Sequence, residues 1–229
     1  MRHFIFILLL NTVFSLTWAQ EKNCRCNYYN VSEEVLEDKI TGISLTDENI
    51  KLPEKEIYSQ WSKGDIILNN GEKITNRTIR YDGTSDQLIV SSTDKGIKVA
   101  VEKNTIKGFD INMFNSDKIL HYKKIKIKII LSSEYVDGYA QLLVSGKTSL
   151  YAWRRLQHIG ATDNLITHYS YIIVKEDGTM FYFLVYSRRY IASLFPEKKN
   201  IFKSQLRKQH NRVRNEDQLI KAVEFYNSL

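Results

Sequence analysis

The stretch Lys123–Leu131 reads KKIKIKIIL and decides the fold class. Isoleucines and lysines alternate along it, with Ile125, Ile127 and Ile129 on one side and Lys124, Lys126 and Lys128 on the other. Successive side chains of a strand point to opposite faces, so this period of two predicts a strand with one buried face. The lysines are expected on a solvated sheet face or a charged edge. A stripe that binds a polyanion is the alternative.

Short turns rich in asparagine, aspartate and glycine divide much of the remaining chain into further strands. Asn69-Asn70-Gly71 and Asp177-Gly178 are the clearest of these turns, because such residues tolerate the positive φ of tight hairpins. Besides the strand at residues 123–131, strands are expected at residues 65–68, 73–81, 88–92, 97–101, 105–111, 138–144, 149–156, 169–174 and 180–186. This pattern predicts an antiparallel β-meander, whose first five strands form a small curled sheet or barrel.

The apolar period becomes helical after Tyr186. Helices are expected around residues 190–195, 201–206 and 219–226. Asn215 with Gln218 has the form of an N-capping box for the last of them. The fold class is therefore α+β: an antiparallel meander, then further hairpins, then a C-terminal helical segment that docks its apolar faces on the sheet.

Residues 1–19 have the form of a secretory signal peptide. Arg2 supplies the positive charge, Phe4–Leu10 is wholly apolar, and Ala19 is the small residue after which cleavage is expected. Asn11 interrupts the apolar run well before the roughly 18–20 residues that a spanning helix needs. We therefore expect an exported protein, located in the periplasm, in the outer cell envelope or outside the cell, with no transmembrane span in the mature chain.

Composition divides the mature chain into three parts. Residues 20–62 form a polar lead-in of loop with marginal structure, 63–117 a β-meander subdomain, and 118–229 the later hairpins and the helices. Residues 20–117 carry 13 Lys and Arg against 17 Asp and Glu, a balance of −4, whereas 118–229 carry 19 against 9, a balance of +10. Such asymmetry fits two subdomains that pack together, or a basic face that meets an anionic partner.

The densest basic set lies in the expected helical segment. A solvated helix face accounts for it without a ligand, and contact with an anionic envelope surface is the functional alternative. Only Phe202 is interleaved with these charges, so base stacking has little support and nucleic acid is not an expected partner. The candidate contact residues are the tail residues Lys198, Lys199, Lys203, Arg207 and Lys208 and the strand residues Lys124, Lys126 and Lys128.

The sequence contains no defensible motif for catalysis, a cofactor or a metal. Gly-x-Ser-x-Gly is absent, so Ser145 and Ser149 lack the context of a nucleophile elbow, and no phosphate-cradling glycine loop occurs. Cys24 and Cys26 are the only cysteines, and a zinc site would need two further ligands at a suitable spacing. We therefore predict a noncatalytic interaction or structural module, with envelope proteins or an anionic surface as partners. The alternatives are an extracellular hydrolase whose site is assembled from distant residues, and a peripheral binder of polyanions or anionic surfaces that uses the basic C-terminal half.

Several segments together resemble uncharacterised exported proteins of Bacteroidetes-type bacteria. They are the leader ending in Ala19-Gln20, the hairpin GDIILNNGEKI of Gly64–Ile74 with Arg80-Tyr81 after it, Phe109 and Phe114, GKTSLY of Gly146–Tyr151, and the tail closing on Tyr226-Asn227. The resemblance covers most of the mature chain. It implies an envelope or secreted setting and transfers no catalytic residue.

Overall fold

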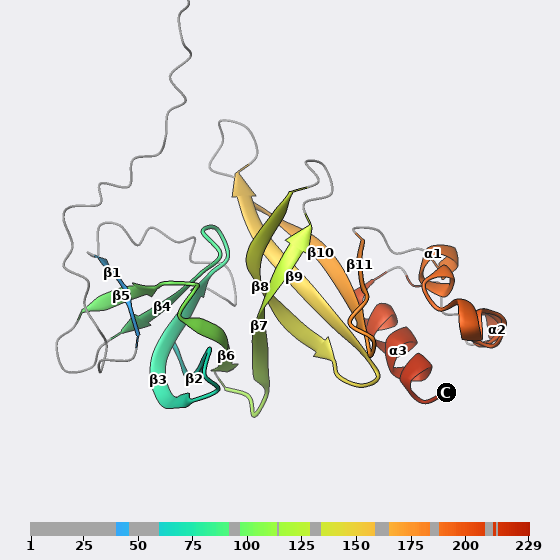
Figure 1. Ribbon diagram of the computed structural model, residues 1–229, viewed down its shortest axis with the longest axis horizontal. Coiled ribbons are helices and arrows are strands. Elements are labelled where there is room, and N and C mark those ends of the chain that lie inside the picture. Colours follow the sequence, from blue (N-terminus) through green and yellow to red (C-terminus); the bar gives the residue numbers. More distant parts are fainter. Residues whose placement is uncertain are drawn as a thin grey trace, which may run out of the picture. The chain divides into compact units, whose positions relative to one another are not determined.

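A computed structural model describes residues 40–45, 60–91, 97–113, 115–128, 134–158, 165–183, 188–208, 213 and 215–229. The strands are β1 (Gly42–Leu45), β2 (Ser62–Leu68), β3 (Lys73–Asp82), β4 (Gln87–Ser91), β5 (Lys98–Val101), β6 (Ile106–Asn112), β7 (Ile119–Lys128), β8 (Tyr135–Val144), β9 (Thr148–His158), β10 (Leu165–Lys175) and β11 (Met180–Phe183) (Figure 1). The helices are α1 (Arg188–Ser193), the 3-10 turn η3 (Pro196–Lys198), α2 (Lys199–Lys208) and α3 (Glu216–Asn227). The expected signal peptide and both cysteines lie outside the described residues.

The strands form one antiparallel sheet in the order β1-β5-β4-β3-β2-β6-β7-β8-β9-β10-β11. The predicted antiparallel meander and the helical segment after it are confirmed. Over the described residues the sheet is open, with β1 and β11 as its edge strands, so the closed barrel considered for the first strands does not form. β6 and β7 pair with each other on either side of residue 117, so the sheet runs across the expected subdomain boundary.

The polar lead-in contains a strand that the sequence did not predict. Gly42–Leu45 forms β1 and pairs with β5. Ile40, in the same segment, is a bridge residue with 1% of its surface exposed. The strands approach closely at Gly42, where a Cβ atom would lie 2.4 Å from the carbonyl oxygen of Ala100. Four residues are too few to show a strand period, which explains why the pattern was missed.

The first part of the sheet curls strongly. Residues 102–105 alone connect β5 to β6, yet β4, β3 and β2 lie between these strands. At about 4.8 Å per strand, a flat sheet would hold β5 and β6 about 19 Å apart. The link from Val101 to Ile106 reaches at most about 17 Å when extended. The sheet must therefore bend to bring β5 toward β6, and Figure 1 shows β3 as a strongly bent ribbon.

An aromatic cluster lies inside this first curl. Phe109 and Tyr122 stack with ring centroids 4.8 Å apart, and Tyr81 lies 5.1 Å from Tyr122. Tyr139 of β8 meets Phe109 edge-on at 5.1 Å. All four residues are buried. Their offset and edge-on contacts are the preferred geometries for aromatic rings, so they strengthen the core beyond simple apolar burial.

The predicted alternation of β7 is confirmed over its described part. Ile125 and Ile127 are buried, whereas Lys126 and Lys128 are exposed. Tyr122 lies three residues before Ile125, so the two side chains point to opposite faces of the sheet. The isoleucines accordingly belong to a different apolar cluster, which they share with β8, β9 and β10. Residues 129–131 of the predicted strand lie outside the described residues.

This second cluster lies inside a curl of the opposite sense. β8, β9 and β10 separate β7 from β11 in the sheet. Nevertheless, the Tyr182 hydroxyl of β11 donates a hydrogen bond of 2.9 Å to the Lys126 carbonyl oxygen of β7. The sheet must bend to bring these strands together. Ile172, on the same strand face as the enclosed cluster, is fully buried.

The helices cover the other face of β8–β11. Tyr171 and Ile173 flank Ile172 in β10 and therefore point away from the second curl. They pack in one cluster with buried residues of all three helices, among them Phe202 and Leu206 of α2. The predicted docking of the helices on the sheet is thus confirmed.

Side chains fix α3 to the sheet at both ends. Asn215 caps its start as predicted, accepting a bond of 3.0 Å from the Gln218 N–H. Glu216 accepts bonds of 2.7 and 2.8 Å from the Arg154 guanidinium of β9. At the other end, the Asn227 amide exchanges two hydrogen bonds with the backbone of Thr148. α3 is therefore a fixed support for the elements that pack on it.

Candidate functional site

Asp86 is the one charged residue in the buried class among the described residues, with 1% of its surface exposed. It ends the turn between β3 and β4, where its φ of 56° lies in the left-handed region that aspartate tolerates better than most residues. A buried carboxylate is costly unless hydrogen bonds and an opposite charge compensate it. The hydrogen-bond partners of Asp86 therefore indicate whether its carboxylate has a structural role or a reactive one.

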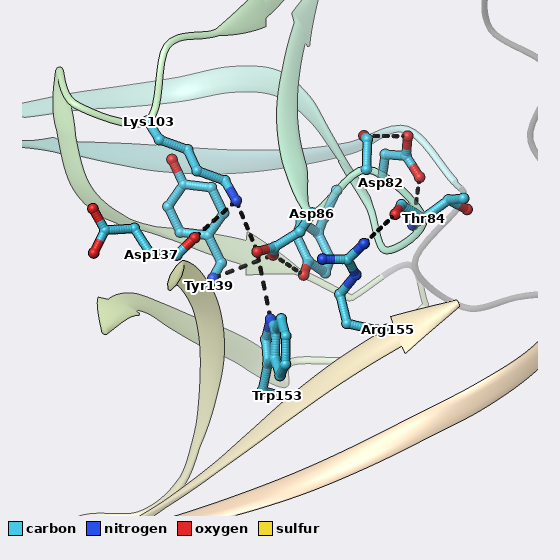
Figure 2. A network of polar contacts seen from close by, with 10 residues as sticks. Asp82, Thr84, Asp86, Lys103, Asp137, Tyr139, Trp153 and Arg155 are labelled. Atoms are coloured by element: carbon cyan, nitrogen blue, oxygen red, sulfur yellow. Dashed lines mark hydrogen bonds and ion pairs between the residues drawn. The ribbon is translucent and has the colours of Figure 1, made fainter. Parts of the chain in front are cut away.

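Both oxygens of Asp86 accept hydrogen bonds from distant parts of the chain, as Figure 2 shows. Oδ1 receives the Tyr81 hydroxyl at 2.5 Å and the Tyr139 N–H at 3.2 Å. Oδ2 receives the Lys103 ammonium at 2.8 Å and the Trp153 indole N–H at 3.4 Å. Burial, and next the charge of Asp86, raise the pKa of Tyr81, so its hydroxyl remains a donor. The carboxylate is thus occupied by protein donors.

The position of Asp86 follows from a split in the sheet. β8 pairs with β9 only from Gln141 onward, opposite Ala152, so the earlier residues of β8 have no β9 partner among the described residues. Asp86 binds Tyr139 on one side of this split and Trp153 on the other. We call the β3–β4 turn, residues 83–86, the Asp86 wedge.

Two basic side chains hold the Asp86 wedge in place. Lys103 donates a second bond, of 3.0 Å, to the carbonyl oxygen of Asp137 in β8. Arg155 of β9 donates a bond of 2.8 Å to the carbonyl oxygen of Thr84 in the turn. A ligand would have to displace these internal bonds. The arrangement fits a joint between the two curls better than a reactive centre.

The predicted basic tail forms an ordered row on α2. Lys199, Lys203 and Arg207 follow each other at intervals of four residues, which places them along one side of the helix. Lys199 and Arg207 are exposed and Lys203 is half-buried. None of the three side chains forms an ion pair or hydrogen bond with another described residue. We call these three residues the α2 basic row.

The apolar side of α2 is firmly held. Phe202 and Leu206 are fully buried, and the Phe202 ring meets Phe195 and Tyr226 edge-on at 5.5 and 5.8 Å. Packing on this side fixes the rotation of the helix about its axis. The α2 basic row is consequently presented by a preformed scaffold.

The other predicted contact residues have different surroundings. Lys198 belongs to η3, and its ammonium lies 5.6 Å from the centre of the Tyr226 ring. Lys124 donates a bond of 2.7 Å to the Lys103 carbonyl oxygen, so it supports the region of the Asp86 wedge. Lys126 stands directly opposite Asp137 in the β7–β8 register, and Lys128 is exposed. The side chain of Lys208 lies outside the described residues.

A charged cluster that the sequence analysis missed crosses β3, β2, β6 and β7. The Lys73 ammonium lies 2.8 Å from Asp65 and 3.2 Å from Asp110. His121 Nδ1 lies 2.7 Å from Asp110 Oδ1. The Lys73 hydrogen bond lowers the pKa of Asp65. Only the strand register brings these residues together, and an exposed network of this kind contributes little stability.

Within the described ranges, no group of His, Cys, Asp and Glu could hold a metal ion, and no helix is long and apolar enough to cross a membrane. Ser145 lies exposed in the β8–β9 turn, and Ser149 is a half-buried residue of β9.

Comparison with known proteins reveals no relative: no family model, no curated protein and no solved structure matches this chain.

Proposed function

We propose that this protein is an exported, noncatalytic interaction module of the cell envelope that attaches to an anionic lipid surface through the α2 basic row. The observation that carries the proposal is the combination of an immobilised apolar side of α2 with a row of cations that have no carboxylate partner among the described residues. The export signal expected at the N-terminus supplies the setting.

Electrostatic attraction gives the α2 basic row a substantial binding free energy at an anionic membrane surface. A lysine or arginine held near an anionic membrane surface contributes about 1 kcal/mol, so three contribute about 3 kcal/mol. Because Phe202 and Leu206 already hold α2 in place, little ordering would be needed on contact. Ile201 of the same helix is 61% exposed and could add apolar contact at the headgroup level.

Charge reversal on α2 is expected to abolish vesicle binding. The mature chain should sediment with vesicles that contain phosphatidylglycerol, and weakly with vesicles of phosphatidylcholine alone. The triple variant K199E/K203E/R207E should lose at least about 100-fold in affinity for the anionic vesicles, because it removes three favourable charges and adds three unfavourable ones. The affinity of the unmodified chain should fall as salt rises.

The variant K126E/K128E is the matched control, because it reverses two exposed lysines that stand in β7. It should retain most of the vesicle affinity. The proposal is wrong if the β7 variant loses binding while the α2 variant keeps it, or if the unmodified chain ignores the lipid charge.

A further inference from the structure

A pocket of about 320 Å³ lies beside the start of α2. The β8–β9 turn, the β10–β11 turn, η3 and the end of α3 line it. Its charged residues are three lysines and three acids, namely Lys147, Lys175, Lys198, Glu176, Asp177 and Glu197. The formal charge of the lining is therefore balanced, although both signs are concentrated in a small space.

Lys175 is largely enclosed, with 18% of its side chain exposed. Its ammonium forms an ion pair with Glu197, whose carboxylate oxygen is 3.8 Å away and therefore too far for a hydrogen bond. The ammonium also lies 5.4 Å from the Phe181 ring and 5.5 Å from the Phe195 ring. Aromatic faces attract a cation but accept N–H groups poorly. Lys175 thus lines the pocket with an ammonium that is ion-paired to Glu197 but donates no side-chain hydrogen bond to another described residue.

Two of the acids around the pocket, Glu197 and Asp177, are ionised at neutral pH. Glu197 accepts a hydrogen bond of 2.5 Å from the Tyr226 hydroxyl, which lowers the pKa of Glu197. Burial and this carboxylate raise the pKa of Tyr226 to about 12, so the hydroxyl keeps its proton. The backbone N–H of Thr179 binds Asp177 at 2.8 Å and lowers its pKa. Each carboxylate retains free acceptor sites after these bonds.

We infer that this pocket binds a small zwitterion, a ligand that carries an anionic oxygen group and a primary ammonium group. The anionic group, a phosphate or a carboxylate, meets Lys175 with Lys147 and Lys198 beside it. The ammonium group meets Glu176 and Asp177 of the β10–β11 turn. A ligand of one sign alone would lie close to like charges of the lining, and this cost favours a ligand with both charges.

Calorimetric titration of the mature chain tests the inference. O-phosphoethanolamine and β-alanine are the zwitterionic probes, and they separate phosphate from carboxylate recognition. Inorganic phosphate carries only the anionic group of O-phosphoethanolamine, and ethanolamine carries only its ammonium group. At least one zwitterion should bind at least about tenfold more tightly than either half, the ratio expected from one charge-assisted hydrogen bond. Equal affinity for phosphate alone, or no binding of either zwitterion, would overturn the inference.

Lys175→Met retains the apolar stem between the aromatic rings and removes the charge. It should weaken binding of the preferred zwitterion at least about tenfold. Lys107→Met, at an exposed position of β6, is the matched control and should bind normally. The double variant E176Q/D177N should lose the preference for the zwitterion over phosphate. This second variant leaves Lys175 and its packing untouched, and an unchanged preference would contradict the placement of the ammonium group.

The pocket and the α2 basic row are tested separately. The variant K199E/K203E/R207E should bind the zwitterion with the affinity of the unmodified chain, because its three positions do not line the pocket. Lys175→Met should sediment normally with anionic vesicles. A failure of vesicle binding would therefore not contradict the pocket inference. A failure of zwitterion binding would likewise not contradict the proposed role of the α2 basic row.

Discussion

Replacing Asp86 by alanine is expected to lower the free energy of unfolding by about 3–5 kcal/mol, the usual cost of removing one member of a buried, hydrogen-bonded charge pair. The change leaves the Tyr81 hydroxyl and the Tyr139 N–H without their acceptor in the core. It also removes the carboxylate oxygen that accepts hydrogen bonds from the Lys103 ammonium and the Trp153 indole N–H. Urea denaturation of the mature chain, followed by tryptophan fluorescence and circular dichroism, measures the effect.

Two further variants test the cause of this loss. Asp86→Asn keeps one acceptor oxygen and the side-chain shape. Its free energy of unfolding should therefore lie between that of the unmodified chain and that of Asp86→Ala. Asp137→Ala removes a nearby carboxylate whose side chain is exposed, and Lys103 uses only the backbone oxygen of that residue. The control should change stability by no more than about 0.5 kcal/mol. Equal effects at the two aspartates would show that the Asp86 wedge is not a structural joint.

Replacing Phe202 by alanine should cost about 3–5 kcal/mol, because it creates a cavity between α2 and the rest of the helical layer. The lost ring contacts Phe195, Phe225 and Tyr226. The same variant should weaken binding to anionic vesicles, since α2 would no longer hold its basic row in place. Thermal unfolding and vesicle sedimentation measure the two effects.

Ile201→Ala is the matched control for Phe202, because the neighbouring side chain is 61% exposed. Its stability should stay within about 0.5 kcal/mol of the unmodified chain. If Phe202→Ala is as stable as Ile201→Ala, the helical layer is not anchored through the Phe202 ring. If stability falls but vesicle binding is unaffected, α2 is not the contact surface.

Local sequence patterns were sufficient to predict most of the strands and all three α-helices. Asn69-Asn70-Gly71 and Asp177-Gly178 mark hairpins because turn chemistry acts within a few residues. The alternation at Ile125 and Ile127 placed their strand face correctly for the same reason. The α2 basic row was also visible as a basic helical segment. Its lack of carboxylate partners among the described residues required the structure.

Features that depend on distant pairing were not predictable. β6 follows β5 after only four residues, yet it pairs with β2, and nothing in the local pattern indicates this pairing. Asp86 follows a Gly-Thr-Ser sequence and has the composition of an ordinary turn residue. Lys175 precedes a turn and gives no sign of its two aromatic neighbours. Such sites arise from the curl of the sheet, which single-sequence periodicity does not contain.

The Asp86 wedge also has a consequence for the rate at which the chain folds. Its bonds to Tyr139 and Trp153 span 53 and 67 residues. Closing such long loops costs entropy before the contacts repay it, so they should form after the local hairpins. Interactions that form late are absent from the folding transition state. Asp86→Asn should consequently speed unfolding in stopped-flow experiments while leaving the refolding rate nearly unchanged, which makes this turn a determinant of the native-state lifetime.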